Sequence, residues 1–428
     1  MEAVQYGINK GDNEAPVEVE TRPGDLDHLR PLPRISIHAF CETDGMYGLM
    51  EKLAQDRRMA KVSFRINQGG IQAAANMFAT TPTPNLIILE TSALPREIMN
   101  ELEPLAEVCD PSTKVILIGR YNDIPLYREL IRNGISEYMV APVSLADLVS
   151  AISAIFVDPE AEPLGRSIAF IGAKGGVGAS TIAHNIAWEI STIFSSEVIL
   201  ADLDLPFGTA NIDFDQDPPQ GIAEAIFSPE RLDEMFLDRL LAKCSERLSL
   251  LAAPSLLDRA YDIDRTAFHP VLELLQRTAP VNVLDVPHVW NEWTRALLAD
   301  VDEVVIVAAP DLANLRNAKN IFDCLRKMRP NDKPPHLVLN QVGMPKRPEI
   351  SPADFCEPLE VQPIATIPFD IQLFGTAANS GRMIAETDAK SPVSEILSQV
   401  AHVVTGRATV KKAKTGGLGG LLAKLRKS

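Results

Sequence analysis

The run Gly172-Ala173-Lys174-Gly175-Gly176-Val177-Gly178-Ala179-Ser180-Thr181 stands between two apolar segments of this chain. Residues 167–171 precede it and form an apolar strand pattern, and Ile182 opens an apolar stripe with helical spacing behind it. A strand, a glycine-rich turn and a helix in this order cradle phosphate, because glycines let backbone N–H groups close on phosphate oxygens and the helix N-terminus adds its positive dipole end. The predicted nucleotide-binding residues of this loop are Lys174, Gly175, Gly176, Val177, Gly178, Ala179, Ser180 and Thr181.

Two positions set the class of this loop. Lys174 stands early, beside the double glycine, and Ala179 stands where a P-loop normally has a lysine. With this early lysine, the loop resembles the deviant P-loop of the MinD/ParA ATPases. In that family the lysine reaches across a dimer to the partner's phosphates, so the resemblance implies that Lys174 acts in catalysis and links nucleotide binding to dimerisation. A lysine at position 179 would contribute charge-assisted contacts of about 1.5–3 kcal/mol each, and Ala179 therefore predicts weak or slow hydrolysis.

Acidic residues close two further strand patterns. Residues 198–204 form an apolar strand that ends in Asp202 and Asp204, and strand alternation places both carboxylates on one side at the edge where ligands bind. The resemblance implies that Asp202 supports the water shell of Mg²⁺ and that Asp204 positions the attacking water. Asp285 closes an apolar strand of the Walker B type. With the hydroxyl of Ser180, these residues give the expected metal set of Ser180, Asp202 and Asp285.

The base end of the site is expected further along the chain. Residues 337–340 and 367–370 resemble the strands that hold adenine in this family, with Asn340 as the base contact and Pro368 beside it. Each piece alone has another interpretation, since Asp285 could cap a helix and the double glycine could form only a tight turn. Their order and their positions at strand ends favour a site for ATP and Mg²⁺.

A smaller α/β pattern comes first. Five strand patterns between residues 35 and 140 alternate with helical ones, which predicts a doubly wound five-stranded parallel sheet. Residues 85–90 and 133–142 in it resemble the response-regulator receiver. A working receiver needs an acceptor aspartate, acidic Mg²⁺ ligands, a hydroxyl and a lysine, and this chain instead has Glu90, Glu42, Gly119 and Ala141. The resemblance implies a docking module that is not phosphorylated, while phosphorylation at Glu90 or a neighbour stays open as the alternative.

Bulk properties set the frame for both patterns. A chain of 428 residues exceeds one ordinary core. We expect a disordered lead-in at 1–33, a receiver-like domain at 34–156, a linker at 157–165, a larger P-loop α/β ATPase domain at 166–405 and a tail at 406–428. The net charge of −16 argues against nonspecific nucleic-acid binding. Five scattered cysteines, with no apolar leader or span, predict a cytoplasmic protein.

The last residues reverse the charge of the chain. Their apolar positions fall at i, i+3, i+4 and i+7 and are surrounded by basic residues, a pattern typical of helices that lie in a membrane surface. The residues concerned are Leu418, Leu421, Leu422, Leu425, Lys424, Arg426 and Lys427. We expect this tail to recruit the chain to the inner membrane surface. A solvated basic tail is the alternative, because so short a helix is marginal alone.

The combination of the two domains narrows the family. A degenerate receiver joined to a deviant P-loop domain with Ala179 closely resembles the CpaE/TadZ pilus-assembly proteins. The resemblance implies a localisation factor at a cell pole for a Flp-type (tight-adherence) pilus or type II-like secretion machine. It would form a homodimer through a nucleotide sandwich and through the receiver-like domain, with machinery proteins or a polar scaffold as partners. An actively cycling ATPase that positions cargo and a signalling regulator acting through Glu90 are the alternatives.

Overall fold

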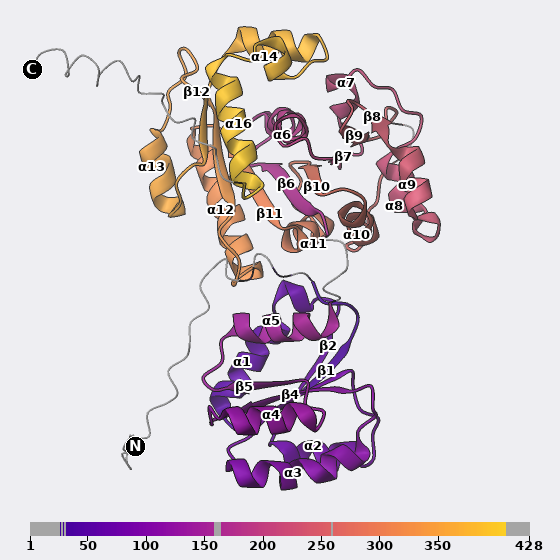
Figure 1. Ribbon diagram of the computed structural model, residues 1–428. Coiled ribbons are helices and arrows are strands. Elements are labelled where there is room, and N and C mark those ends of the chain that lie inside the picture. The colour runs from indigo at the N-terminus through magenta and orange to yellow at the C-terminus, as the bar shows by residue number, and fades with distance from the viewer. Residues whose placement is uncertain (1–25, 27–28, 30, 158–163, 258–259, 408–428) are drawn as a thin grey trace, which may run out of the picture. The chain divides into compact units, whose positions relative to one another are not determined.

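The computed structural model describes residues 26, 29, 31–157, 164–257 and 260–407, and these form two compact units (Figure 1). Unit 1 takes its described residues from Met1–Leu164 and from Phe322–Pro334, and unit 2 takes them from Gly165–Ile321 and Pro335–Ser428. Both units are α/β with parallel sheets, as the sequence predicts. No helix in the described part of the chain is both long enough and apolar enough to cross a bilayer.

Unit 1 is built on a five-stranded parallel sheet with strand order β2-β1-β3-β4-β5. Its strands are β1 (Ser36–Cys41), β2 (Ser63–Gln68), β3 (Leu86–Glu90), β4 (Lys114–Gly119) and β5 (Glu137–Val140). Its helices are α1 (Asp44–Ala54), α2 (Ile71–Phe78), α3 (Pro95–Val108), α4 (Ile124–Arg132) and α5 (Leu145–Phe156), with the short helix η1 (Arg57–Met59). Side-chain alternation along β1 separates two cores, because Ile37 packs in the cluster of α1 and α5 while Phe40 packs in the cluster of α2, α3 and α4. Helices therefore cover both faces of the sheet.

Unit 1 begins earlier in the chain than expected. Leu26 and Leu32 are 0% and 1% exposed and belong to the core cluster of α1 and α5. The predicted lead-in of residues 1–33 is therefore too long at its C-terminal end. Burying these two leucines is favourable because it removes apolar surface from water, although the prolines and acids around them are typical of a disordered segment.

A segment from late in the chain also belongs to unit 1. The guanidinium of Arg58 is fully buried and donates to the carbonyl of Leu26 at 3.0 Å and to Asp332 Oδ1 at 2.8 Å. Arg57 donates to the other carboxylate oxygen of Asp332 at 2.8 Å. A buried arginine requires such partners, because an unpaired charge in the interior is costly. The predicted domain of residues 166–405 is therefore interrupted, since Phe322–Pro334 is counted with unit 1.

Unit 2 is built on an eight-stranded sheet with strand order β13-β12-β11-β6-β10-β7-β9-β8. Its strands are β6 (Arg166–Gly172), β7 (Val198–Asp202), β8 (Ala242–Lys243), β9 (Leu248–Leu251), β10 (Val281–Val286), β11 (Glu303–Ala308), β12 (His336–Val342) and β13 (Ala365–Pro368). Every pair is parallel except β8 with β9. The chain builds outward from β6 in both directions, so the end of β6 is the switch point at which open α/β sheets bind ligands.

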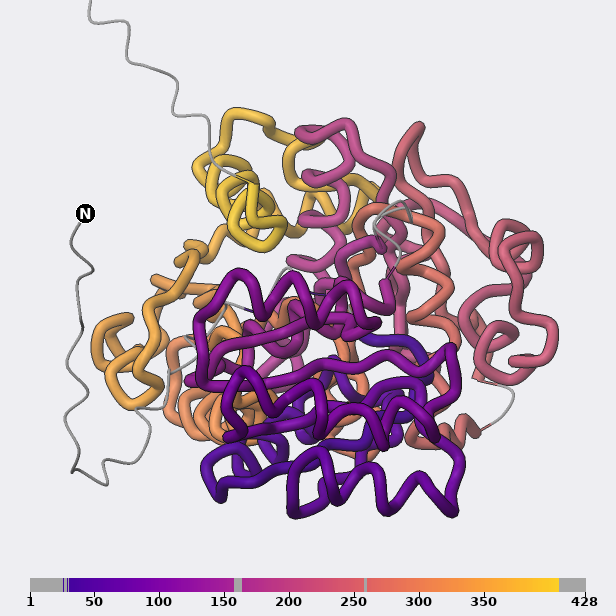
Figure 2. Tube along the Cα trace, turned by 60° about the horizontal axis from the view of Figure 1, so that its bottom comes forward, coloured from indigo at the N-terminus to yellow at the C-terminus, as the bar shows by residue number. Residues whose placement is uncertain are grey.

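Eleven helices accompany this sheet in the described part of the chain. They are α6 (Ala179–Ile193), α7 (Ala210–Asp213), α8 (Ile222–Phe227), α9 (Glu234–Leu240), α10 (His269–Thr278), α11 (Glu292–Asp300), α12 (Leu312–Met328), α13 (Pro352–Cys356), α14 (Ile371–Asn379), α15 (Ile384–Thr387) and α16 (Pro392–Val404), with η2 (Pro229–Arg231) and η3 (Glu357–Leu359) as short 3₁₀ turns. The middle of helix α6, from Ile182 to Ala187, is buried, and α16 packs along the helix although the two are far apart in the sequence (Figure 2).

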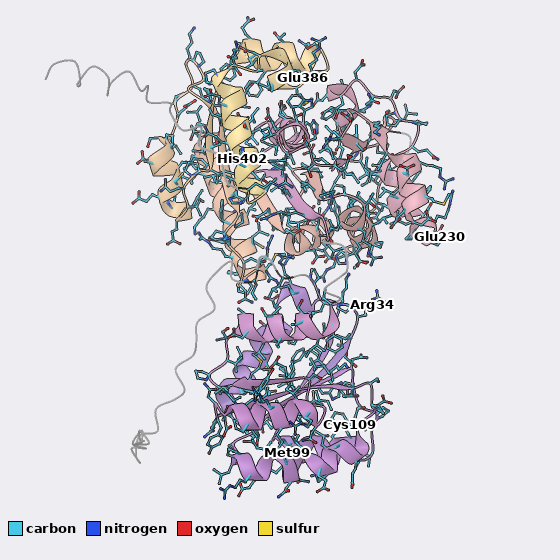
Figure 3. The ribbon with its side chains drawn as sticks, viewed as in Figure 1. Arg34, Met99, Cys109, Glu230, Glu386 and His402 are labelled. Atoms are coloured by element: carbon cyan, nitrogen blue, oxygen red, sulfur yellow. The ribbon has the colours of Figure 1, made fainter. Side chains whose placement is uncertain are left out.

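The end of α16 is fixed against α6 by aromatic contacts. The ring of His402, labelled in Figure 3, meets the ring of Phe194 edge-on at a centroid distance of 4.8 Å. The guanidinium of Arg407 lies 4.6 Å from the centroid of the same ring, a cation–π contact. The last described residues of the chain thus pack against the end of α6 in unit 2.

Candidate nucleotide-binding site

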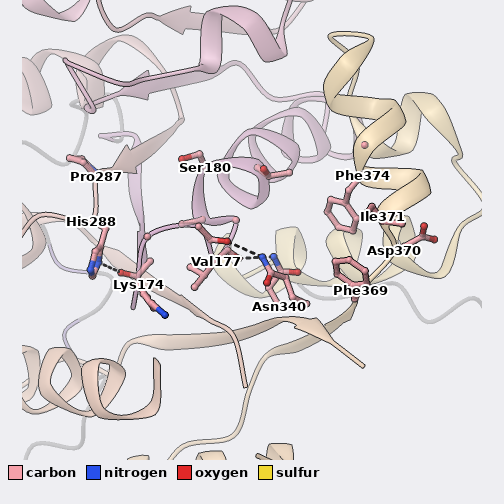
Figure 4. Close-up of a pocket in the computed structure, with 18 of the residues that line it drawn as sticks. Lys174, Val177, Ser180, Pro287, His288, Asn340, Phe369, Asp370, Ile371 and Phe374 are labelled. Atoms are coloured by element: carbon pink, nitrogen blue, oxygen red, sulfur yellow. Dashed lines mark hydrogen bonds between the residues drawn. The ribbon is translucent and has the colours of Figure 1, made fainter. Parts of the chain in front are cut away.

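A pocket of about 570 Å³ opens at the carboxyl ends of β6, β10, β12 and β13. Every residue from Lys174 to Thr181 lines it, together with Asp204, Asn340 and Pro368. The structure therefore brings the predicted phosphate loop, the predicted water-positioning acid and the predicted base end around one cavity (Figure 4). The volume lies within the range of about 300–1,000 Å³ that is usual for small-molecule sites.

The loop has the backbone that its glycines allow. Gly176 and Gly178 have φ angles of 80° and 84°, in the left-handed region that residues with a side chain rarely adopt. Gly178 also stands directly against β12, since a Cβ placed on it would lie 2.7 Å from Asn340 Nδ2. The N–H groups of Ala179, Ser180 and Thr181 begin α6 and have no acceptor within the helix. They remain for a ligand.

Asn340 braces this loop from β12. Its Nδ2 donates to the carbonyl of Val177 at 2.8 Å, and Gln341 Nε2 donates to the carbonyl of Gly176 at 2.9 Å. The sequence predicts Asn340 as a contact to the base. The structure shows one end of its amide engaged by the loop, so any contact to a base would use the other end.

The two positions that set the class of the loop both lie at the pocket. Ala179 is half-buried and presents only a methyl group to the cavity. Lys174 is exposed. Burial works in the other direction, but hydrogen bonds from Asn314 and the positive charge of Lys174 lower the pKa of Asp311. Position 179 therefore brings no charge to the cavity, and Lys174 is the one basic residue of the loop sequence 172–181.

Asp202 and Asp285 do not line the cavity as its described residues define it. Asp202 is fully buried, and its two carboxylate oxygens accept from the backbone N–H groups of Asp204 and Ala210, each at 3.1 Å. Burial raises the pKa of Asp202 to about 7, and the nearby charge of Asp285 adds to the shift. Gly208 lets the backbone come this close, because a Cβ there would lie 2.4 Å from Asp202 Oδ2.

His184 completes the buried group. It lies on α6 with no exposed surface, with Nδ1 2.7 Å from Asp213 Oδ2 and Nε2 3.2 Å from Asp285 Oδ2. Burial disfavours its charged form, but the carboxylates of Asp213 and Asp285 outweigh that penalty and raise its pKa to about 10. His184, Asp202 and Asp285 thus form one buried cluster, with a ligand atom of each within 4.8 Å of those of the other two.

The donor set can be tested against Mg²⁺. Ser180 and Asp204 offer oxygen atoms at the pocket wall, and oxygen is the ligand that Mg²⁺ prefers. Asp202 already accepts two backbone hydrogen bonds, and Asp285 faces His184. These residues fit an ion that would be held by Ser180 and by phosphate oxygens. Asp202 and Asp285, which do not line the cavity, would act on it only indirectly.

Sequence reasoning missed two histidines. His184 stands four residues after Ser180, a spacing that brings two helical residues onto one face. His288 follows Asp285-Val286-Pro287 and lines the pocket, with Nδ1 2.8 Å from the carbonyl oxygen of Gly172. A polar residue just after an acid-closed strand was the available signal for His288. The predicted tail, from Leu418 to Lys427, lies outside the described residues.

The four receiver positions gather at the carboxyl edge of the unit 1 sheet. Glu90 accepts hydrogen bonds from the backbone of Glu42 at 2.7 Å, from the backbone of Thr43 at 2.9 Å and from Thr43 Oγ1 at 2.7 Å. The carboxylate of Glu42 in turn accepts from the backbone of Ser92 at 2.9 Å. Glu90 therefore fastens the turn that leads into α1.

Tyr138 fills the space beside the other two positions. Its hydroxyl donates to the carbonyl of Tyr121 at 2.9 Å, and a Cβ on Gly119 would lie 2.5 Å from that hydroxyl oxygen. Ala141 donates its backbone N–H to the carbonyl of Gly119 at 2.8 Å and precedes the cis peptide bond to Pro142. The ring of Tyr138 thus leaves no room for a side chain at position 119, where a working receiver has its hydroxyl residue.

Comparison with known proteins identifies solved structures that are similar to this chain. No protein-family model matches the chain, and no curated protein matches it either. Among solved structures, it is similar to a ParA family ATPase from Chlorobium tepidum TLS, at 23% identity over 55% of this chain and 98% of that one, with a TM-score of 0.51. The septum site-determining protein MinD from Pyrococcus horikoshii OT3, complexed with Mg-ADP, matches at 17% identity over 56% of this chain and 96% of that one, with a TM-score of 0.50.

A third match covers a smaller part of the chain. The pilus assembly protein CpaE from Caulobacter crescentus CB15 is 42% identical over 30% of this chain and 98% of that one, with a TM-score of 0.29. The likeness to the ParA and MinD structures concerns the fold, and it agrees with the eight-stranded sheet and the phosphate loop at its switch point. The chain therefore has the α/β fold of the MinD/ParA-type P-loop ATPases, together with a five-stranded parallel sheet.

Proposed function

We propose that unit 2 binds ATP with Mg²⁺ and that the bound nucleotide drives formation of a homodimer, with weak or slow hydrolysis. The observation that supports this most is the single cavity lined by residues 174–181, Asp204, Asn340 and Pro368. The MinD structure of the same fold was solved with Mg-ADP. The methyl group of Ala179 is the reason to expect poor turnover, because it gives no charged contact to the phosphates.

The dimer part of the proposal is supported by the surface around the pocket. Lys174 is exposed and lines the pocket, and in the single chain its charge acts on the carboxyl group of Asp311. In a dimer the same ammonium would instead meet the phosphates of the second copy. Large apolar side chains are exposed just after the strands that end at this edge. They are Phe207, Val289, Trp290, Leu312 and Ile371.

The cellular part of the proposal follows from the combination of domains. We propose a cytoplasmic localisation factor that marks a cell pole for a Flp-type pilus or type II-like secretion machine. Unit 1 would dock a partner or a second copy without phosphorylation, because the carboxylate of Glu90 is engaged by the turn at Glu42 and Thr43 and Tyr138 leaves no room for a hydroxyl side chain at position 119. Machinery proteins or a polar scaffold are the expected partners, and no specific nucleic acid is expected of a chain with net charge −16.

Nucleotide-dependent sedimentation tests the switch. The full chain should sediment as a monomer without nucleotide and as a dimer with MgATP. Lys174→Ala should abolish the dimer, whereas Lys243→Ala, an exposed lysine on the edge strand β8, should not. The same species with and without MgATP would contradict the proposal.

Hydrolysis separates the switch from an actively cycling ATPase. Asp204→Ala should keep nucleotide binding and remove residual turnover. Turnover near or above about 1 per second, the lower end of ordinary enzymes, would instead favour the cycling ATPase.

Localisation tests the cellular role. A fluorescent fusion should gather at a pole in cells with the pilus genes, and the same pattern in cells that lack both the pilus genes and their partners would argue for a different machine. The tail is tested by co-sedimentation with liposomes of anionic lipid, because two copies in a dimer gain avidity. The full chain should pellet with MgATP more than a version ending at Thr405, and equal pelleting would show a solvated tail.

A further inference from the structure

The strand order fixes the direction in which a nucleotide would lie in the pocket. The predicted base end is formed by β12 and β13, which stand on one side of β6, while β10 and β7 stand on the other side. In Figure 4, Phe369, Ile371 and Phe374 lie at one end of the cavity and His288 and Pro287 lie at the opposite end, with Val177 between them. A nucleotide with its base at β12 and β13 therefore directs its last phosphate toward His288 and Asp204.

His288 is anchored on one side of its ring and open on the other. Its Nδ1 lies 2.8 Å from the carbonyl oxygen of Gly172. A carbonyl oxygen can only accept, so Nδ1 carries the hydrogen. Nε2 has no hydrogen-bond partner among the described residues, and the exposed side chain lines the cavity. The strand end thus presents a fixed ring with one free nitrogen.

The phosphate end of the pocket needs such a group. Ala179 gives no ammonium there, Pro287 has no N–H, and Asp204 is an acid that repels phosphate oxygens. In the protonated imidazole both nitrogens donate, and hydrogen bonds from charged donors to phosphate are the strong ones. Lys174 and Ser180 also bring donors to this pocket, and His288, just after β10, adds another from a ring that is held by a hydrogen bond to the carbonyl of Gly172.

We propose that His288, with its ring protonated on both nitrogens, donates from Nε2 to the terminal phosphate of ATP and so distinguishes ATP from ADP in a loop that lacks the usual lysine. The proposal rests on the proposed function, because it requires nucleotide in this pocket. It assigns Gly172 the role of holding the ring, since the hydrogen bond to its carbonyl fixes which nitrogen faces the cavity.

Two substitutions separate the nitrogens. In His288→Asn the amide can replace Nδ1 as a donor to Gly172 but offers nothing at the position of Nε2. In His288→Gln the amide reaches the position of Nε2. Affinities of the full chain for MgATP and MgADP are measured by calorimetry for the natural protein and both variants, with thermal unfolding to show that each variant is folded.

We expect His288→Asn to lose about tenfold in affinity for MgATP, the loss of one good hydrogen bond, and to keep its affinity for MgADP. His288→Gln should retain most of the preference for MgATP. Equal losses for the two nucleotides, or no loss in His288→Asn, would overturn the proposal and leave His288 as a support for the loop. If the natural protein binds neither nucleotide, the proposed function itself fails, and this outcome is distinct because it precedes any substitution.

Discussion

Asp202 and Asp285 are direct register partners on the adjacent parallel strands β7 and β10, and both are buried. Two neighbouring carboxyl groups in an interior repel each other when ionised. His184 lies within the same group of ligand atoms, 3.2 Å from Asp285 and 2.7 Å from Asp213. The positive charge of His184 therefore stabilises the carboxylates at the ends of β7 and β10. Its contact with Asp213 links these strand ends to α7, the helix that follows Asp204.

Replacing His184 by leucine should destabilise the protein by about 3 kcal/mol or more, because removing one partner of a buried ion pair leaves the other charge uncompensated. Chemical unfolding followed by circular dichroism measures the change. Thr192→Ala, an exposed position on the same helix, should change stability little. A His184→Leu protein as stable as the natural one would show that the carboxyl groups are neutral without the histidine.

Restoring the missing lysine with Ala179→Lys should strengthen MgATP binding by about tenfold or more, since a lysine at this position adds a charge-assisted hydrogen bond to phosphate. Calorimetry with MgATP gives the affinity. Thr192→Lys adds the same charge to the same helix away from the pocket and should leave affinity unchanged. An affinity that does not rise would mean that the loop does not place residue 179 against the phosphates.

Glu90→Ala should lower the stability of unit 1 by about 3 kcal/mol, because the turn at Glu42 and Thr43 loses three hydrogen bonds to a carboxylate. Glu90→Gln keeps one acceptor oxygen and should cost less than half of that. Exposed Glu103→Ala serves as the control on α3. The free energy of unfolding is measured for all three variants. If Glu90→Ala were as stable as Glu103→Ala, the hydrogen bonds of Glu90 would not stabilise unit 1. A test of phosphorylation should use Glu90→Gln, because that variant disturbs the fold less.

Glu189 predicts a pH-dependent change in stability. It is 5% exposed on α6, and burial raises its pKa from 4.5 to about 7. Between those two pH values the unfolded chain has released this proton and the folded chain still holds it, so this group makes the natural protein lose stability as pH rises through the interval. Glu189→Gln should be more stable by about 3 kcal/mol at pH 8, with the difference vanishing near pH 4. Exposed Glu197→Gln should show no such trend, and a pH-independent difference for Glu189→Gln would mean that the carboxyl group is solvated.

The parts of the site that sequence predicts well are those with local causes. The phosphate loop, the acids that close β7 and β10, and the receiver positions each follow from a short pattern whose geometry is set by the backbone at that point. Glycines at 176 and 178 have positive φ, as the cradle requires. The pairing of Asp202 with Asp285 follows from parallel strands that end at one edge.

The parts that sequence does not predict depend on contacts between distant segments. Arg58 looks like a surface charge until Asp332, far along the chain, becomes its partner in the core of unit 1. Leu26 lies among prolines and acids, and only the packing of α1 and α5 makes its burial favourable. The spacing of His184 from Ser180 shows only that both share a face of α6, and the acidic partners of His184 come from α7 and β10.

The internal carboxylate of Glu90 also affects whether the state of unit 1 can change after the protein has folded. A phosphoryl group is added and removed, so a receiver that uses one records a recent event and then forgets it. The hydrogen bonds that Glu90 makes to Glu42 and Thr43 form when the chain folds and persist as long as it stays folded. If unit 1 acts without phosphorylation, as proposed, every folded copy carries the same carboxylate from its synthesis onward. A cell would then alter its output through the number of copies, through the partner that unit 1 docks or through what unit 2 binds.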